Sequence, residues 1–243
     1  MKAFWLALGF LSWIPTPHFM ADDRDLGRAV ALFPVVGAGF GALLWGGLAA
    51  SHGRLPDAVV GGLLVALLAA LSGGLHLDGL ADTFDAVGAS AKPDPAARRE
   101  KMLAVMRDPR TGAHGGAALV VVLGLKAAAL GALAPGPALI LGPALARWTA
   151  SLLVVAFPYA RPEGLGRVFK EQARPGAVAL TGAALLGAAA LTGALAGAAL
   201  ATGGALALAA WVNRRLGGLT GDVYGAAVEL AEALFFVALT AAI

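Results

Sequence analysis

Residues 59–85 read VVGGLLVALLAALSGGLHLDGLADTFD, an apolar run that leads directly into three carboxylates. The apolar part approaches the length of about 20 residues that a helix needs to span a bilayer. Asp78, Asp82 and Asp85 follow at positions i, i+4 and i+7, so on a helix they share one face. Because like charges at this spacing repel, a hard divalent cation, Mg²⁺ or Mn²⁺, is the simplest way to hold them together. The stretch therefore predicts a metal site beside His76 at a membrane boundary, with an acidic helix start or a solvated loop as the alternative.

The composition indicates a membrane protein. Of the 243 residues, 59% are hydrophobic and 14% are charged, and the mean hydropathy of +0.79 lies outside the range of soluble domains. There is no cysteine, so disulfide and thiolate chemistry are excluded. We therefore expect an all-α fold, a polytopic integral membrane helical bundle of about seven transmembrane helices, with residues 1–243 forming a single domain. The expected spans are about 30–50, 58–75, 115–133, 138–157, 177–195, 198–212 and 224–243.

Two apolar segments do not fit one span each. Residues 3–14 are too short to cross a bilayer comfortably, and Trp5 and Trp13 suit the membrane–water interface. We therefore expect an N-terminal interfacial helix rather than a signal peptide or an eighth span. The uncharged Ala/Gly-rich run at 176–210 is too long for one span, and we expect a break near Gly197–Gly204.

The basic residues of the loops are distributed unevenly. The segment up to Arg28 and the segments 76–114, 158–175 and 213–222 carry them, whereas the other short loops carry only Arg54. With seven spans the basic loops share one side of the membrane, which the positive-inside rule makes cytoplasmic. We attribute the net charge of +3 to this bias rather than to nucleic-acid binding.

A second polar cluster closes the longest loop with the sequence RDPRTGAH, directly before the third expected span. Arginine offers forked donors to phosphate oxygens, and glycines let backbone N–H groups approach a bound anion. Arg107, Arg110 and His114 are therefore candidates for phosphate contacts, and Asp108 is a candidate carboxylate. The alternative is a basic loop that anchors the end of a helix.

A third cluster, RLGGLTGDVYG, begins at Arg215. Its Asp222 is a candidate metal ligand or catalytic carboxylate, or else a helix N-cap. Glu229 follows seven residues later on nearly the same helical face, inside an expected span, where carboxylates usually face a polar interior. Glu229 is therefore either a substrate-binding residue or the partner of Lys126 or Arg147.

Two arginines complete the candidate set. Arg147 falls within an expected span and needs a carboxylate or phosphate partner, while Arg161 follows that span and adds a donor near the same surface. No Gly-x-Ser-x-Gly, Walker A or His-Glu-x-x-His motif occurs, which disfavours catalysis by a serine nucleophile. The residues instead fit metal-assisted phosphoryl transfer, in which positioning and charge neutralisation supply most of the rate.

The three motifs are GLHLDGLADTFD at 74–85, MRDPRTGAHG at 106–115 and GGLTGDVYGAAVELAE at 217–232. Together and in this order they resemble the cobalamin synthase family, the adenosylcobinamide-GDP ribazoletransferases. The resemblance covers the whole chain from FLSWIPTP at 10–17 onward. The positions that depart from the family pattern leave every acidic residue in place and are Trp13, Ala86, Pro109 and Tyr224.

The resemblance implies a Mg²⁺-dependent transferase of the bacterial inner membrane, with a cytoplasmic active-site loop at about 76–114. Its partners would be the bilayer and two small molecules, adenosylcobinamide-GDP and α-ribazole or α-ribazole 5′-phosphate. The products would be GMP and adenosylcobalamin or its 5′-phosphate. A homo-oligomer, or an association with other cobalamin-assembly enzymes, is left open.

Within this reaction we assign individual roles to the candidates. Mg²⁺ or Mn²⁺ on the first motif would bind the diphosphate, and Asp108 or Asp222 would complete the metal shell or accept a proton. The metal ligands are Asp78, Asp82 and Asp85. The catalytic residues are Asp82, Asp108 and Asp222. The substrate-binding residues are His76, Arg107, Arg110, His114, Arg147, Arg161, Arg215 and Glu229.

Two other classes fit less well. A CDP-alcohol phosphotransferase uses the pattern D-x2-D-G-x2-A-R, but Leu75 replaces its first aspartate and no arginine follows Asp82 in that register. An ion-coupled transporter would also bury carboxylates and arginines, but it should show internal repeats and helices broken near the midplane. The charges of this chain cluster instead in loops on one side.

Overall fold

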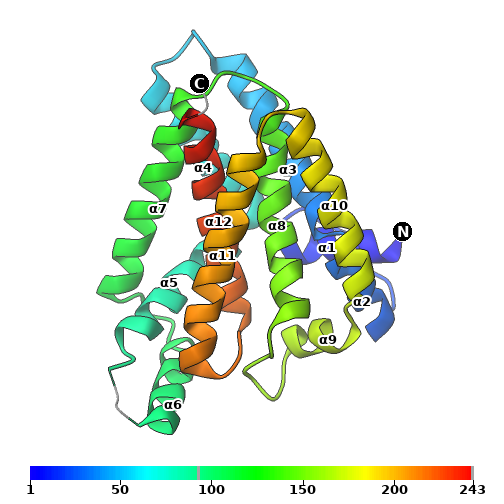
Figure 1. Cartoon of the computed structure of the whole chain (residues 1–243), viewed down its shortest axis with the longest axis vertical. Helices are drawn as coiled ribbons and strands as arrows, with labels where there is room; N and C mark the ends of the chain where they lie inside the picture. The colour runs from blue at the N-terminus through cyan, green and yellow to red at the C-terminus, as the bar shows by residue number, and fades with distance from the viewer. Residues whose placement is uncertain (92–93, 242–243) are drawn as a thin grey trace.

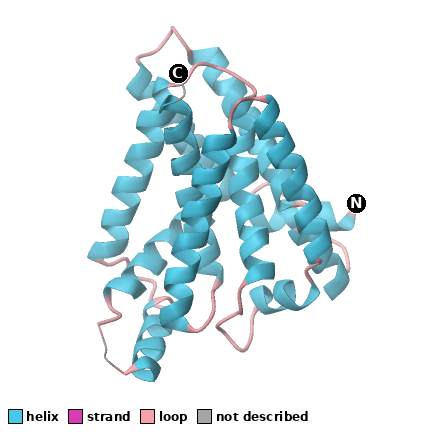
Figure 2. Cartoon of the chain, viewed as in Figure 1, coloured by secondary structure: helices cyan, strands magenta, loops and turns pink. Residues whose placement is uncertain are grey.

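The structure is a computed structural model that describes residues 1–91 and 94–241, and these residues form twelve helices joined by short loops (Figures 1 and 2). No strand occurs in the described ranges, where one isolated bridge joins Tyr159 to Leu219. Five shorter helices are α1 (Lys2–Leu11), α2 (Asp23–Val30), α5 (Leu75–Gly88), α6 (Pro95–Val105) and α9 (Leu165–Gln172). The long helices are α3 (Phe33–Ser51), α4 (Asp57–Ser72), α7 (Ala113–Ala132), α8 (Ala138–Ala156), α10 (Pro175–Leu191), α11 (Leu195–Leu216) and α12 (Gly221–Ala241).

The expected membrane bundle of about seven spans is confirmed. Helices α3, α7, α8, α11 and α12 are each long and apolar enough to cross a membrane, and two bent helix pairs raise the number to seven. The chain bends by 94° between α4 and α5 and by 87° between α9 and α10. Of these two pairs, α4 and α10 run along the bundle, whereas α5 and α9 lie across it toward the end that carries α6 (Figure 1). We therefore count α4 and α10 as the spans of their pairs.

Two expected boundaries were wrong. The span placed at 58–75 ends at Ser72, because the chain turns there into α5. The break expected near Gly197–Gly204 lies instead between Leu191 and Leu195. The reason is packing: a Cβ atom at Gly197 would stand 3.2 Å from the Phe235 ring, so this glycine serves close contact between α11 and α12 rather than a turn.

The first helix is too short to cross a bilayer. It has ten residues, packs against α2 and α3, and lies across the bundle rather than along it (Figure 1). Phe10 at its end contacts the rings of Phe33 on α3 and Phe169 on α9, with centroids 5.8 and 5.0 Å apart. These three aromatic rings hold the N-terminal segment against the end of the bundle.

Two helices form the centre of the molecule. Helix α8 packs against α3, α10, α11 and α12, and α12 packs against α5, α7, α8 and α11. Both have apolar side chains on nearly all faces, which is typical of helices surrounded by protein. The polar side chains that α12 places inside the bundle are therefore shielded from lipid.

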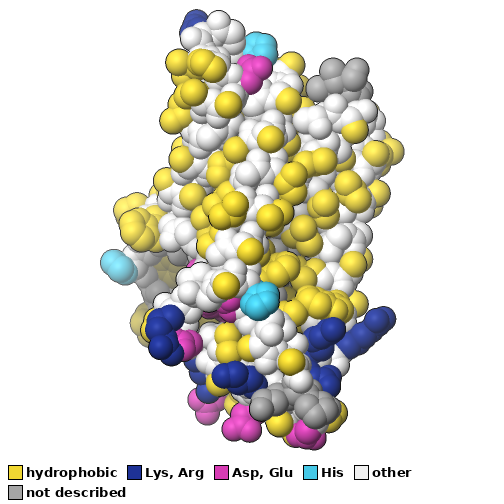
Figure 3. Space-filling view, turned by 90° about the vertical axis from the view of Figure 1, so that its left-hand side faces the viewer, with side chains coloured by type: hydrophobic (Ala, Val, Ile, Leu, Met, Phe, Trp, Pro, Cys, Tyr) yellow, Lys and Arg dark blue, Asp and Glu magenta, His cyan; other side chains and the backbone are white. Residues whose placement is uncertain are grey.

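Charged side chains gather at one end of the molecule, below a wide apolar surface (Figure 3). We call this the basic end; it is formed by α5, α6 and α9 and by the loops at 106–112, 157–164 and 217–220 (Figure 1). Arg54 lies at the opposite end, in the loop between α3 and α4. Lys92, another basic residue of the longest loop, lies outside the described residues.

Candidate active site

The first and third motifs meet where α5 crosses α12 at the basic end. The crossing is close because a Cβ atom at Gly79 would stand only 2.6 Å from the carbonyl oxygen of Asp222. On the other helix, a Cβ at Gly225 would lie 3.2 Å from the Cα atom of His76. Backbones this close bring Asp78 and Asp222 to the wall of one cavity.

The direction of α5 depends on the turn that precedes it. Gly73 ends α4 in the left-handed conformation with φ of +61°, which disfavours any residue with a Cβ atom. A Cβ there would also stand 1.9 Å from Nε1 of Trp13. The backbone N–H of Trp13 donates to the carbonyl of Leu71, which fixes the N-terminal segment to the turn.

Asp78, Asp82 and Asp85 all lie on α5, as their spacing predicts. Burial first, and then the carboxylates of Asp78, Asp222 and Asp85, raise the pKa of Asp82 to about 6, while Arg161 opposes them weakly. The cluster therefore carries more negative charge than its own cations neutralise.

A divalent cation is the natural partner of such a cluster. Hard carboxylate oxygens from two helices are the donors that Mg²⁺ accepts, and a bound cation would relieve the repulsion around Asp82. In their present positions, however, no three His, Asp or Glu side chains of the described chain converge on one metal position. The donor set fits a metal ion, and the carboxylates would have to move toward it.

The third carboxylate of the series already has partners. Asp85 accepts hydrogen bonds from the backbone N–H groups of Gly112 at 2.6 Å and Gly115 at 2.8 Å, at the start of α7. It thereby satisfies donors that a helix start leaves unpaired. Asp85 joins the first motif to the second, and its role as a metal ligand stays a prediction.

The second motif lies on the surface beside α5. Arg110 donates to both carboxylate oxygens of Asp108, at 2.9 and 2.6 Å, and this pair lowers the pKa of Asp108 to about 2. A carboxylate with so low a pKa is a poor proton acceptor at neutral pH. Asp108 and Arg110 line a cavity of about 310 Å³ together with Asp85 and His114. Arg107 is exposed at the same end.

Arg161 is the cation that pairs with Asp222 where the two helices meet. It donates to Asp222 Oδ2 at 2.8 Å, and the buried hydroxyl of Thr220 donates to the same oxygen at 3.1 Å. Two backbone hydrogen bonds of 2.8 Å hold the loop that carries Arg161 against Leu219. The N–H of Ala160 donates to the carbonyl of Leu219, and the N–H of Leu219 donates to the carbonyl of Pro158. The ion pair between Asp222 and Arg161 is therefore a tertiary contact, whereas the hydrogen bond from Thr220 is local.

A cavity of about 290 Å³ opens at this point. Its polar lining comes from α5, from the loop before α9 and from the first turn of α12. His76 is buried, and its Nδ1 atom has no hydrogen-bond partner in the described part of the chain. The polar residues that line the cavity are His76, Asp78, Tyr159, Arg161, Glu163, Asp222 and Tyr224.

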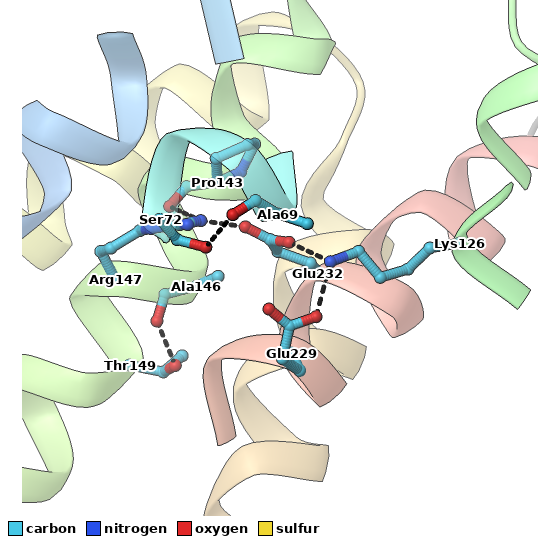
Figure 4. A network of polar contacts seen from close by, with 9 residues as sticks. All are labelled: Ala69, Ser72, Lys126, Pro143, Ala146, Arg147, Thr149, Glu229 and Glu232. Atoms are coloured by element: carbon cyan, nitrogen blue, oxygen red, sulfur yellow. Dashed lines mark hydrogen bonds and ion pairs between the residues drawn. The ribbon is translucent and has the colours of Figure 1, made fainter. Parts of the chain in front are cut away.

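The charges inside the membrane bundle form a separate network (Figure 4). Lys126 of α7 pairs with Glu229 at 2.8 Å and with Glu232, and Arg147 of α8 pairs with the second oxygen of Glu232. All four side chains are almost fully buried. Two cations thus balance two carboxylates, as buried charges require.

This network changes the assignment of two predicted substrate-binding residues. Arg147 and Glu229 have their charge partners inside the bundle, and neither lines the 290 Å³ cavity among its described residues. The alternative that the sequence left open for Glu229, an ion pair with Lys126, is the one observed. We therefore assign both residues to the stability of the bundle.

Arg215 stands apart from the cavity. Its guanidinium lies over the ring of Trp211, 4.3 Å from the centroid, on the last turns of α11. Sequence reasoning did not single out Arg99, which donates to the carbonyls of Ala160 and Leu216 and ties α6 to the loop of Arg161. Nothing in the sequence distinguishes Arg99 from the other arginines of its loop.

Comparisons with known proteins agree over the full chain. The model of the family described as Cobalamin-5-phosphate synthase matches residues 3–240. A protein of Pseudomonas paraeruginosa named adenosylcobinamide-GDP ribazoletransferase is 41% identical over 98% of this chain and 98% of its own length. Proteins of the same name from Citrobacter koseri (40% identical, 98% and 99% covered) and Roseiflexus sp. (38%, 96% and 87%) are also similar. No solved structure matches the chain.

Proposed function

The chain belongs to the cobalamin-5-phosphate synthase family, and we propose that it works as an adenosylcobinamide-GDP ribazoletransferase by Mg²⁺-assisted phosphoryl transfer where α5 crosses α12. The substrates would be adenosylcobinamide-GDP and α-ribazole or its 5′-phosphate. The products would be GMP and adenosylcobalamin or adenosylcobalamin 5′-phosphate, in the last assembly step of cobalamin biosynthesis.

One observation supports this site above the others. Asp78 of the first motif and Asp222 of the third line one cavity with Arg161, and both carboxylates lie near enough to Asp82 to raise its pKa, although more than 130 residues separate the two motifs in the chain. Phosphoryl transfer needs this combination, because charge must be held on both sides of the phosphorus while the reactants are positioned.

The reaction exchanges one phosphorus–oxygen bond for another. A ribose hydroxyl of α-ribazole attacks the phosphorus next to the cobinamide, and the bond from that phosphorus to the oxygen of the departing GMP breaks. Bound to Asp78 and Asp82, Mg²⁺ would supply charge neutralisation on the diphosphate.

The remaining steps fall to side chains of the cavity. Asp222 accepts the proton of the attacking hydroxyl, because it lines the cavity, whereas Asp108 lines a separate cavity and has the low pKa described above. Arg161 contacts Asp222 through one terminal nitrogen, while its Nε atom has no hydrogen-bond partner in the described residues. That buried Nε–H would donate to a phosphate oxygen once the side chain shifts toward the substrate, and would help stabilise the GMP leaving group.

We propose that the protein lies in the bacterial inner membrane with its basic end in the cytoplasm. The loops of the basic end carry the Lys and Arg residues that the positive-inside rule assigns to that side. Both substrates are polar and adenosylcobinamide-GDP is charged, so they would reach the cavity from water at this end.

The test is GMP release by the purified protein in lipid nanodiscs, with Mg²⁺, with Mn²⁺ and with EDTA. We expect release only with a divalent cation. Asp222→Asn should reduce the rate by about a hundredfold or more while the melting temperature is unchanged, because Asn keeps the volume but loses the charge. Asp23→Asn, an exposed residue at the start of α2, is the matched control and should keep full activity.

Two results would contradict the proposal. Normal turnover by Asp222→Asn would make the third motif structural. Transport of a substrate into sealed vesicles without GMP release would place the protein in the transporter class.

A further inference from the structure

A second cavity, of about 510 Å³, adjoins the candidate active site. Tyr159 and Arg161 line both cavities, so the two share a wall. The second cavity is lined by arginines and a lysine from three segments: α6, the loop after α8, and α9. Its charged lining residues are Arg99, Arg161, Arg167, Lys170 and Glu171.

Cations outnumber carboxylates in this cavity by four to one. The one carboxylate, Glu171, is held by Arg167 Nε at 2.7 Å in an exposed pair. Lys170 donates to the backbone carbonyl of Val155 at 2.9 Å, and partial burial lowers the pKa of its ammonium group. Arg161 is paired with Asp222 and Arg167 with Glu171, whereas Arg99 and Lys170 donate to backbone carbonyls. Carbonyls do not cancel the charge of these two cations, so the cavity keeps an excess of positive charge.

Three elements fix the shape of the cavity. Arg99 of α6 donates to the carbonyls of Leu216 and Ala160, and Arg167 of α9 donates to the carbonyl of Pro162. These bonds hold α6, α9 and the loop between them in one arrangement. Forked donors held in place are what a phosphate monoester requires, because several of its oxygens accept hydrogen bonds at once.

We propose that this cavity binds the 5′-phosphate of α-ribazole 5′-phosphate while its ribose hydroxyl lies in the adjoining active site. This subsite rests on the proposed function and explains how the chain would prefer the phosphorylated form of that substrate. The diphosphate of the other substrate belongs to the aspartate cluster, on the far side of Arg161. An anionic lipid headgroup shares the chemistry of a phosphate monoester, and the experiment separates the two.

The variant that tests the subsite is Arg167→Gln, which removes one cation from the exposed side of the cavity. In nanodiscs of phosphatidylcholine alone, KM for α-ribazole 5′-phosphate should rise about tenfold or more, as expected for one lost charge-assisted contact. The KM for unphosphorylated α-ribazole, the KM for adenosylcobinamide-GDP and kcat should stay within about twofold. Lys170→Gln should act in the same direction.

Two matched controls accompany it. Glu171→Gln removes the only carboxylate of the cavity and should leave KM for the phosphorylated substrate unchanged or lower. Arg214→Gln removes an exposed cation at the same end, on α11, and should change nothing. An equal rise in KM for both forms of α-ribazole, or no rise for either, would overturn the proposal.

A binding measurement separates this proposal from the proposed function. Calorimetric titration of α-ribazole 5′-phosphate into the wild type in EDTA, without the GDP substrate, should show binding that Arg167→Gln weakens about tenfold. If wild-type binding is intact but no GMP is released, the proposed function fails and the subsite stands. If addition of phosphatidylglycerol changes activity equally with both forms of α-ribazole, and Arg167→Gln removes that effect, the cavity binds a lipid headgroup and the subsite is refuted.

Discussion

Asp82→Asn should make the metal-free protein more stable while it abolishes turnover. A pKa of about 6 in place of 3.8 means that the ionised carboxylate is destabilised in the folded protein. Without solvent screening, this pKa difference corresponds to about 3 kcal/mol in the free energy of unfolding. Because Asp82 is only partly buried, solvent screening reduces the expected gain to about 1 kcal/mol, or about 2 to 4 °C in Tm for a chain of this size.

The gain should depend on pH with a defined sign. The folded-state pKa of Asp82 is raised, so the stability that protonated Asp82 contributes is fully present below about pH 4 and is lost as the pH rises through about 6. Wild type and Asp82→Asn should therefore melt together near pH 4 and differ most above pH 7.

The assay is thermal unfolding in nanodiscs at several pH values, with EDTA and with Mg²⁺. Mg²⁺ should stabilise the wild type but not Asp82→Asn. The difference between their melting temperatures should therefore become smaller or change sign. GMP release should fall about a thousandfold in the variant, as expected when charge stabilisation by a metal ion is lost. Asp23→Asn should behave as the wild type in both measurements.

The reasoning would be refuted if Asp82→Asn melted below the wild type in EDTA at pH 7.5. That result would mean that the carboxylate is stabilised in the folded protein and needs no cation. Equal stabilisation of wild type and variant by Mg²⁺ would place the metal elsewhere.

Three further predictions concern the architecture. Gly79→Ala places a Cβ atom 2.6 Å from the carbonyl oxygen of Asp222, so it should lower stability by about 1–3 kcal/mol and reduce GMP release, and unchanged melting and turnover would refute the close crossing. Glu232→Gln leaves the charges of Lys126 and Arg147 poorly balanced and should lower the free energy of unfolding by about 3–5 kcal/mol. The measurement is the yield of folded protein after detergent extraction, and a normally stable variant would contradict a structural role for the network. A cysteine at Ala91 should be labelled from the cytoplasmic side and one at Pro135 from the opposite side, and labelling of both from one side would contradict the seven-span topology.

The number of spans could be predicted from the sequence because it depends on local composition. A hydrophobic run of span length has the same preference for the bilayer wherever it stands in the chain, so each of the seven expected segments overlaps one helix: α3, α4, α7, α8, α10, α11 or α12. The same holds for the helix that carries Asp78, Asp82 and Asp85, whose spacing is a local property. The break near Gly197–Gly204 was wrong because many glycines of that run are compatible with either a turn or a close helix contact.

The tertiary structure alone decided which charged residues meet. The spacing of the three aspartates cannot tell that α5 turns 94° away from α4, or that Asp85 binds the start of α7. Arg147 looked equally suited to a phosphate and to a carboxylate, and only the packing of α8 against α12 pairs it with Glu232. Residue types and spacing determine what a side chain is able to bind, whereas its partner depends on helix crossings between distant segments, such as the approach of Gly79 to Asp222 that creates the candidate site.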